Sequence, residues 1–402
     1  MNADNARVGA PANAEPFVLL RTFPLMIMYA VGFMSATYMP VWVDATAMHF
    51  GVAVSKIGMV GSLELGAVAV ASILSAAFLD TRHLRWPMIA AVLIGIAGNL
   101  VAGVAPTVDL FTVARLIVGL ANGLLLADIN LRAAQSVAPP RVFAGQIFVM
   151  VLFAIIFFTS APHLLATFGS GSIFFYCMAV GVIALLSVLA LPTSTGSVKQ
   201  QADRAGTPIG LAAMLILGGA TLTFISNNSV WAYLAPSATG AALSLKGLST
   251  LLAFGALLNL AAPLISGWLT GRLSPAIALP FCNIAIAACI FLIAGISEPV
   301  LYGFGALFLP FFVMFAVPFY MGILVKLDAS GRCVAASSAF LMSGAAIGPA
   351  IGGLAMDRGG LKWLAITGIF ITALALSATW VGLSSGLRHR RPDLSPHRAT
   401  VS

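Results

Sequence analysis

Twelve apolar runs follow one another along this chain of 402 residues. Each is roughly 20 residues long, about the length that an α-helix needs to cross a hydrocarbon layer of ~30 Å. Lipid offers no partner for a free backbone N–H or C=O, so runs of this length are expected to be helices. Apolar residues make up 60% of the chain and charged residues only 8%, too few to cover a globular surface. The sequence therefore predicts an all-α integral membrane protein with spans at 22–44, 55–79, 86–105, 109–131, 142–167, 172–191, 208–235, 247–270, 275–295, 299–324, 333–355 and 362–385.

A polar segment at 192–207 follows the sixth span and divides the chain six plus six. Weak internal repetition supports this division, because sliding the first half onto the second places Pro162 on Pro349 and Trp42 on Trp231. We expect two six-helix bundles related by a pseudo-two-fold axis along the membrane normal, with a cavity between them. The expected domains are an N-terminal segment (1–21), a first bundle (22–191), a linker (192–207), a second bundle (208–385) and a basic tail (386–402).

Lysine and arginine are distributed unequally over the two sets of loops. Fifteen of the twenty fall on the side that holds the termini, and this excess predicts that both termini and the 192–207 linker are cytoplasmic. We expect a multi-pass protein of the inner membrane without a signal peptide. The basic tail is interpreted as an anchor on anionic lipid rather than a nucleic-acid site. The four cysteines lack the spacing of a metal site, so no metal or cofactor is expected.

Glu64 and Arg115 are ionisable groups deep within predicted spans, where charges are expensive and usually face a cavity or each other. Counted from the span centres, they lie about 5 Å and about 8 Å on the periplasmic side of the midplane. Opposite charges at similar depth predict an ion pair. Burial opposes ionisation of the carboxyl group and the arginine favours it, which makes Glu64 a candidate proton carrier. A static ion pair that holds two helices together is the alternative.

Other polar side chains lie at comparable depth on helices that are expected to line the cavity. We interpret them as candidate substrate contacts, with ordinary helix-packing hydrogen bonds as the alternative. They are Tyr38, Asn122, Asn227, Asn228, Trp231 and Asn259.

A set of charges is expected at the cytoplasmic ends of the spans. Asp80 ends the second span where the eleventh begins, and a carboxylate beside a helix N-terminus is stabilised. Asp128 and Arg132 could complete a cluster with Arg82 or Arg85. We interpret this cluster as a latch that closes the cytoplasmic side; independent, solvated loop charges are the alternative.

The stretch GAAIGPAIGG at 344–353 lies inside the eleventh span. Gly344, Gly348 and Gly352 form a ridge at i, i+4 and i+8 that lets another helix backbone approach closely, and Pro349 permits bending. We expect this ridge to pack on the second span across the interface between the bundles and to act as a hinge. Close packing without a role in coupling is the alternative.

Several of these motifs resemble those of the major facilitator superfamily. The stretch AAFLDTRHLR after the second span keeps an acid and a basic residue of the family signature, and GWLTGR after the eighth echoes it. ARLIVGLANG in the fourth span resembles the family's fourth-helix pattern, with Arg115, Gly119 and Gly123. The stretch YMPVWVDATAMHFGVAVSKIG resembles the twelve-helix proton-coupled efflux branch. The Gly-rich proline motif, which that family's antiporters carry on the fifth helix, lies here on the eleventh.

The resemblance implies a monomeric secondary transporter that works by alternating access, with a small molecule and protons as partners. The chain lacks the GxxxxGK[ST], HExxH, CxxC and GxSxG patterns, so we do not expect an enzyme. Proton-coupled efflux of a small amphipathic compound is the leading interpretation. Proton-coupled uptake of an organic anion or other nutrient is the first alternative, and a transporter-like solute receptor is the second.

Overall fold

The computed structural model describes residues 15–78, 85–134, 136, 139–189, 210–270, 272–327 and 332–388. Within these ranges 11 helices are long and apolar enough to cross a membrane. The protein is therefore a multi-pass membrane protein. The helices are α1 (Glu15–Phe50), α2 (Val54–Phe78), α3 (Arg85–Val104), α4 (Val108–Ala134), α5 (Pro139–Phe168), α6 (Gly171–Leu189), α7 (Leu211–Trp231), α8 (Leu234–Gly240), α9 (Leu245–Leu269), α10 (Pro275–Ala294), α11 (Pro299–Leu327) and α12 (Arg332–Arg388).

Helix α12 contains two of the predicted spans. Its backbone leaves the helical region at Gly359 and Gly360, and Gly360 has φ +64°, a value that glycine adopts at little cost. The chain reverses at this point, so α12 crosses the bundle twice. The described helices thus account for all twelve predicted spans.

The seventh predicted span differs from the structure. We expected one helix over 208–235, but α7 ends at Trp231 and the short α8 begins at Leu234. Pro236 explains the break, because its nitrogen carries no hydrogen to bond the carbonyl of Ala232. The break leaves an irregular corner at 231–234.

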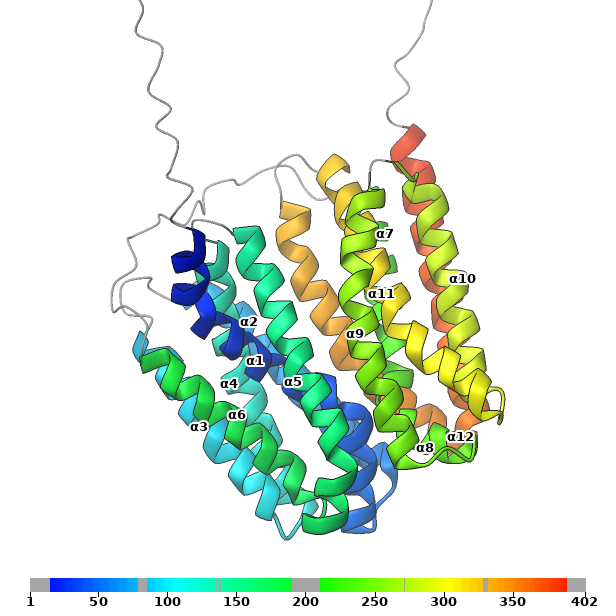
Figure 1. The fold of residues 1–402 in the computed structure, drawn as a ribbon. Helices are drawn as coiled ribbons and strands as arrows, with labels where there is room; N and C mark the ends of the chain where they lie inside the picture. Colours follow the sequence, from blue (N-terminus) through cyan, green and yellow to red (C-terminus); the bar gives the residue numbers. More distant parts are fainter. Residues whose placement is uncertain are drawn as a thin grey trace, which may run out of the picture.

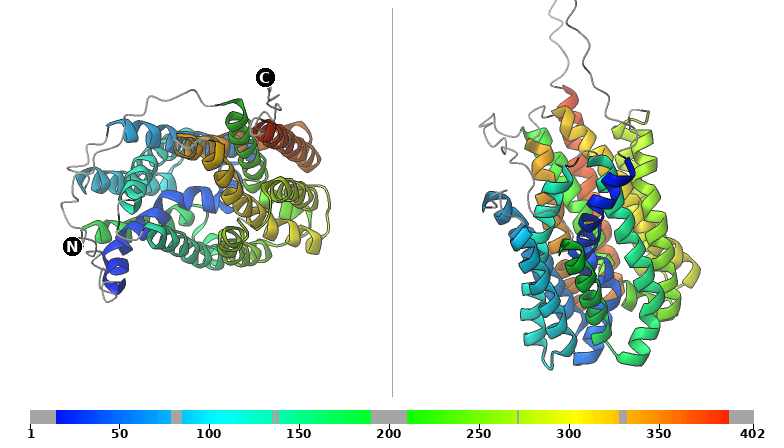
Figure 2. Two further views of the ribbon diagram at one scale, coloured as in Figure 1. Left: turned by 90° about the horizontal axis from the view of Figure 1, so that it is seen from above. Right: turned by 60° about the vertical axis from the view of Figure 1, so that its left-hand side comes forward.

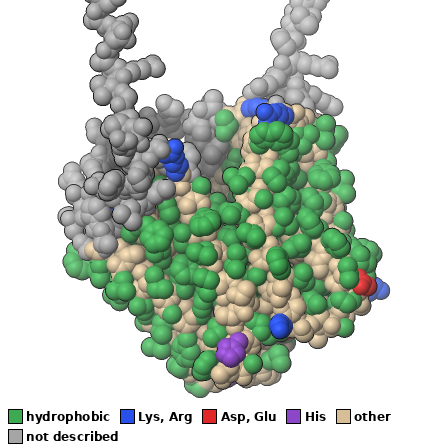
Figure 3. All heavy atoms as spheres, in the orientation of Figure 1, with side chains coloured by type: hydrophobic (Ala, Val, Ile, Leu, Met, Phe, Trp, Pro, Cys, Tyr) green, Lys and Arg blue, Asp and Glu red, His purple; other side chains and the backbone are tan. Residues whose placement is uncertain are grey.

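The helices lie in two groups, which we call the first half (α1–α6) and the second half (α7–α12) (Figures 1 and 2). The start of α1 and the end of α12 lie at the same end of the molecule, which we call the terminal end. The α1–α2 connection and α8 lie at the opposite end. Apolar side chains cover most of the visible face between these two ends (Figure 3). This surface is what a lipid-embedded bundle requires.

The buried apolar core joins the two halves at the opposite end. One cluster contains Tyr38 and Trp42 of the first half together with Tyr233 and Leu252 of the second. A separate cluster lies at the terminal end of the second half alone and includes Leu279. Among the described residues, the halves therefore share a packed core toward the opposite end.

Candidate functional site

Two glycines of α4 bring its backbone close to α2. A Cβ atom at Gly119 would overlap the carbonyl oxygen of Glu64, and one at Gly123 would overlap that of Val68. Arg115 lies one turn before Gly119, on the same face of α4. The close approach of the two helices therefore sets the guanidinium beside the Glu64 carboxylate.

The two groups form a bidentate ion pair. Arg115 Nε donates to Glu64 Oε2 at 2.9 Å, and Arg115 Nη2 donates to Oε1 at 2.5 Å. Further bonds run from Nη1 to Asn99 Oδ1 at 2.9 Å and from Nη2 to Ser35 Oγ at 2.6 Å. Arg115 is 1% exposed and Glu64 is 0% exposed. Since four guanidinium N–H groups have protein partners, the pair is both desolvated and satisfied.

Aromatic rings flank this ion pair. The guanidinium carbon of Arg115 lies 5.6 Å from the ring centroid of Trp42 and 5.2 Å from that of Phe174. Trp42 Nε1 in turn donates to the backbone oxygen of Ser35 at 2.9 Å. The rings add cation–π attraction and exclude lipid and water from the charges.

Sequence reasoning did not single out Ser35, Asn99 or Phe174. Asn99 is recognisable in the sequence, because it is the one amide in the apolar span 86–105. Its carbonyl orients Arg115, and its own Nδ2 donates to Gly95 oxygen at 2.8 Å. A serine in a helix carries no comparable signal.

The two halves meet at a proline kink in α1. Pro40 has no N–H, so the carbonyl of Ala36 lacks its usual helical donor. Trp231, at the end of α7, donates its Nε1 hydrogen to this carbonyl oxygen at 3.0 Å. A kink in the first half thus provides the acceptor for an indole of the second.

Tyr233 lies in the corner between α7 and α8 and is completely buried. Its hydroxyl donates to the carbonyl of Pro349 at 2.8 Å. A Cβ atom at Gly58 of α2 would overlap this hydroxyl, and one at Gly353 of α12 would lie 2.7 Å from it. Tyr233 therefore occupies a cradle made of glycines from both halves.

The glycine ridge of α12 does not pack where we predicted. It faces α7, within the second half: a Cβ at Gly344 would lie 2.6 Å from the carbonyl oxygen of Thr221, and one at Gly348 would lie 2.6 Å from Cβ of Asn228. Gly352 likewise lies against the α7 backbone. The prediction of packing on the second span is wrong, because a sequence shows which face is small but not which helix meets it.

The neighbouring face of α12 is the one that meets α2. Ala350, directly after Pro349, donates its backbone N–H to Ser62 Oγ at 2.7 Å. A Cβ at Gly353 would lie 3.2 Å from Cβ of Ser55. Pro349 thus lies at the contact between the halves, as expected, while its role as a hinge stays a prediction.

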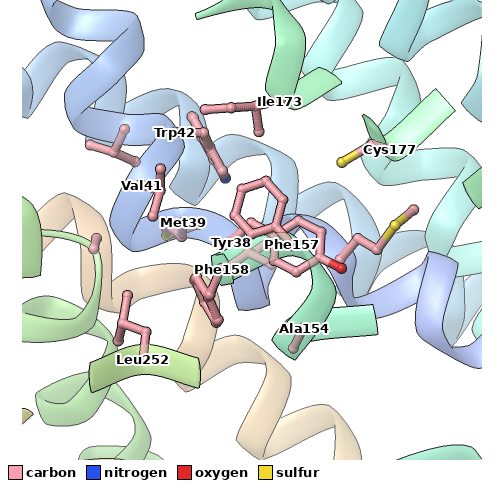
Figure 4. Packing of buried hydrophobic residues seen from close by; sticks show 14 of the residues in the cluster. Tyr38, Met39, Val41, Trp42, Ala154, Phe157, Phe158, Ile173, Cys177 and Leu252 are labelled. Atoms are coloured by element: carbon pink, nitrogen blue, oxygen red, sulfur yellow. The ribbon is translucent and has the colours of Figure 1, made fainter. Parts of the chain in front are cut away.

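The candidate substrate contacts divide into two groups. Tyr38 stacks on Phe157 with ring centroids 3.9 Å apart, inside the first half (Figure 4). Asn228 donates to the carbonyl of Phe224 at 2.9 Å, and Asn122 is buried within α4. Asn227 and Asn259 differ, because each has a buried Oδ1 atom without a hydrogen-bond partner. Among the predicted contacts, only these two amides have a buried oxygen atom without a hydrogen-bond partner.

One further buried amide was not anticipated. Gln146 of α5 is completely buried, and neither its Oε1 nor its Nε2 atom has a hydrogen-bond partner. It lies about 10 Å along α5 from the start of that helix at the terminal end. Among the described residues it is therefore a third orphaned amide, on the first half.

The predicted latch is described only in part. Asp128 is buried and its Oδ1 accepts from Arg132 Nε at 3.3 Å. Asp80 and Arg82 lie outside the described residues, as does the side chain of Arg85, which begins α3. The latch therefore stays a prediction.

A cavity of about 400 Å³ opens at the terminal end of the second half, lined by Arg272, Phe319 and Lys326 among others. It lies at the α9–α10 connection, away from the predicted substrate contacts. It is therefore not the cavity between the halves that the sequence led us to expect.

The helix arrangement resembles that of several solved membrane transporters. The nucleoside transporter NupG superposes with a TM-score of 0.67 at 15% identity, covering 90% of this chain and 98% of that one. A point mutant of NupG gives a TM-score of 0.70 at the same identity. A bacterial homolog to the human lysosomal transporter Spinster, in an inward-facing and unoccupied conformation, gives 0.64 at 13% identity and covers 92% of this chain and 96% of that one. No protein-family model matches the sequence, and no curated protein matches it significantly. At these identities the likeness concerns the fold.

Proposed function

We propose that this protein is a secondary active transporter that moves a small molecule by alternating access. The observation that carries the proposal is the joining of the halves at one end. Trp231 bonds Ala36, Ala350 bonds Ser62, and a packed core surrounds these contacts at the opposite end. Contacts of this kind close one side of a bundle pair and are broken when the halves rock.

The orientation of this closure follows from the charge distribution. We propose that the terminal end is cytoplasmic, since fifteen of the twenty lysines and arginines belong to that side. The opposite end is then periplasmic, and the conformation is closed to the periplasm. A cysteine introduced at Ser197 should resist an impermeant thiol reagent added to intact cells; labelling from outside would contradict this orientation.

Proton coupling through Glu64 is the second part of the proposal. A buried carboxylate with one guanidinium partner has two stable states, paired and protonated, if the surrounding helices move. Glu64 and Arg115 lie on α2 and α4, and α2 also carries Ser62 at the contact with α12. A movement of α2 that opens the periplasmic side would therefore disturb the ion pair. This link supports Glu64 as the proton carrier.

Efflux by proton antiport is the direction that we propose. The resemblance to the efflux branch supports it, and the uptake of an organic anion loses its main argument. An organic anion in the membrane interior needs a free cationic group, whereas the Arg115 guanidinium is committed to Glu64, Asn99 and Ser35.

The decisive experiment is flux into proteoliposomes under an imposed pH gradient. With an acidic interior, antiport drives solute inward as protons leave; with an acidic exterior, symport does so. Uptake driven by the acidic interior is expected. Uptake driven only by the acidic exterior would overturn efflux, and flux indifferent to both gradients would overturn proton coupling.

A further inference from the structure

Asn227 and Asn259 are terminal amides with an unmet hydrogen-bonding capacity in the membrane interior. The Oδ1 atom of each is buried and lacks a partner. A buried polar atom without a partner costs free energy, and native proteins keep few of them. Where one persists beside a route between two domains, a ligand is a natural partner for it.

Both amides lie on helices that contact the first half. Asn227 lies four residues before Trp231, whose indole bonds Ala36 of α1, and four residues after Thr223, whose hydroxyl lies beside Tyr320 of α11. Its side chain therefore lies between the contact with α1 and the interior of the second half. Asn259 lies seven residues after Leu252, on the same face of α9. Leu252 is directed toward Phe158 of α5 (Figure 4). Each amide therefore lies beside a contact between the two halves.

Both amides lie on the terminal side of the contacts that join the two halves. Asn227 is about 6 Å along α7 from Trp231, toward the terminal end, and Asn259 is about 10 Å along α9 from Leu252 in the same direction. The contacts of Trp231 and the shared core lie between these amides and the opposite end. A solute bound to both amides would thus be sealed from that end.

The surroundings of the two amides carry no uncompensated charge. Helix α7 has no charged residue, and Lys246 at the start of α9 is the only one on that helix. In the described spans of the first half, Glu64 pairs with Arg115 and Asp128 with Arg132. Asp44 lies about 12 Å along α1 from Ala36, toward the opposite end and away from the depth of the amides. The remaining charges of these spans lie in the first turns of their helices: Lys56, Asp109 and Arg141. A charged solute at this depth would lack a counter-charge and be strongly disfavoured.

We infer that Asn227 and Asn259 bind the transported molecule, and that this molecule is uncharged and carries both hydrogen-bond donors and acceptors. The inference rests on the proposed function for its site and names the chemical class of the substrate. Each amide offers an acceptor oxygen and two N–H donors, so a hydroxyl or carboxamide group on the solute satisfies it. An apolar body on the same molecule fits the aromatic surroundings.

The test uses the purified full-length protein and pairs of probes that differ in charge. The pairs are nicotinamide with nicotinate, glucose with gluconate, and 2-phenylethanol with 2-phenylethylammonium. Thermal stabilisation in detergent measures binding, and counterflow in proteoliposomes measures transport. At least one uncharged member should stabilise and exchange, and its charged counterpart should do neither. Activity toward charged members alone would overturn the inference but leave the transporter proposal standing.

The opposite failure is equally visible. An uncharged probe that binds but never crosses would support a binding site for uncharged solutes and contradict the transporter proposal. Binding by no uncharged probe contradicts the inference.

Variants separate a ligand-binding amide from a structural one. Asn227→Leu and Asn259→Leu should raise the concentration of the bound probe for half-maximal stabilisation about ten-fold, the effect of one lost hydrogen bond in a buried site. Because their oxygens are unpaired, the unliganded variants should melt no lower than the wild type. Asn283→Leu is the matched control, since Asn283 Nδ2 donates to Leu279 oxygen at 2.9 Å. It should melt lower, and an equal drop for Asn227→Leu would overturn the assignment.

Discussion

Among the described residues, the first and second halves differ in whether their buried polar groups carry charge. The first half holds an ion pair, Glu64 with Arg115, at its centre. The second half holds hydroxyl and amide groups: Tyr320 OH lies 3.2 Å from the hydroxyls of both Thr223 and Thr379. Charges respond to protons whereas hydroxyls and amides near neutral pH do not. The difference suggests that the first half senses the ion and the second half recognises the solute.

Glycines allow two helices to approach closely in both halves, but the close approach serves a different purpose in each. In the first half Gly119 lets α4 touch α2, which brings Arg115 to Glu64. In the second half Gly344 and Gly348 let α12 touch α7, with no charge beside them. The same packing device thus positions an ion pair on one side and builds a rigid helix pair on the other.

The largest effect is expected from Glu64→Gln. The amide keeps nearly the same volume but cannot gain or lose charge, so accumulation driven by a pH gradient should fall to background. Exchange of solute without a gradient needs no net proton movement and should persist. Flux assays in proteoliposomes measure both, with Glu298→Gln as a control near the membrane surface. Normal accumulation by Glu64→Gln would leave the ion pair a purely structural one.

Arg115→Leu should have the largest effect on stability. It leaves a buried carboxylate without its counter-charge, and the expected loss is about 3–5 kcal/mol in the free energy of unfolding. Denaturation in mixed micelles measures it. The double variant Glu64→Leu with Arg115→Leu removes both charges and should recover much of the loss. Arg358→Leu, at an exposed position, is the control; an equal loss there would show that burial of the charge is not the cause.

Gly119→Ala and Gly348→Ala test the two uses of close packing. Each methyl group would collide with a neighbouring helix backbone, so each variant should lose about 1–3 kcal/mol of stability. Only Gly119→Ala should also weaken the response of flux to pH, because it separates α4 from α2. Gly218 has open space around it and is the control, with Gly218→Ala at least as stable as wild type. Equal effects on coupling would remove the distinction between the halves.

Tyr320→Phe tests the uncharged network of the second half. It removes one hydroxyl that lies within 3.4 Å of Asn283 Nδ2 and near two threonine hydroxyls, and about 1 kcal/mol of stability should be lost. The pH dependence of flux should remain that of the wild type. A changed pH dependence would show that the second half also takes part in proton coupling.

The sequence predicted the spans and the ion pair because both depend on quantities that lie along one helix. Span length follows from apolar runs, and depth along two spans sufficed to match Glu64 with Arg115. The sequence does not show how a helix is rotated about its axis relative to its neighbours. The predicted partner of the Gly344–Gly352 ridge was therefore wrong. Pro236 lies directly after the seventh predicted span, and a proline whose nitrogen cannot bond the carbonyl of Ala232 is sufficient reason to expect the break between α7 and α8.

Contacts that depend on three dimensions could not be predicted. Whether Asn227 and Asn259 are bonded or orphaned depends on their neighbours, and the sequence showed only that six polar groups lie at similar depth. The acceptor at Ala36 follows from Pro40 by simple chemistry. The sequence does not show that Trp231 of the second half donates to this acceptor.

The smallest effect, and the sharpest test of how the halves communicate, is expected from Trp231→Phe. The phenyl ring fills part of the indole's place but has no N–H for the carbonyl of Ala36. The bond joins halves that separate when the opposite end opens, so its loss should raise the open population about five-fold, equivalent to about 1 kcal/mol.

Spin labels at Ala53 and Ala242, exposed positions of the two halves at the opposite end, report this opening as a longer distance component. Trp380→Phe, an exposed tryptophan on α12, should leave the distances unchanged. The bond uses an acceptor freed by Pro40 in the first half and a donor from the second half. If Trp231→Phe shifts the population, the two halves are coupled at this contact; an unchanged distance distribution would assign the closure to the glycine cradle of Tyr233 instead.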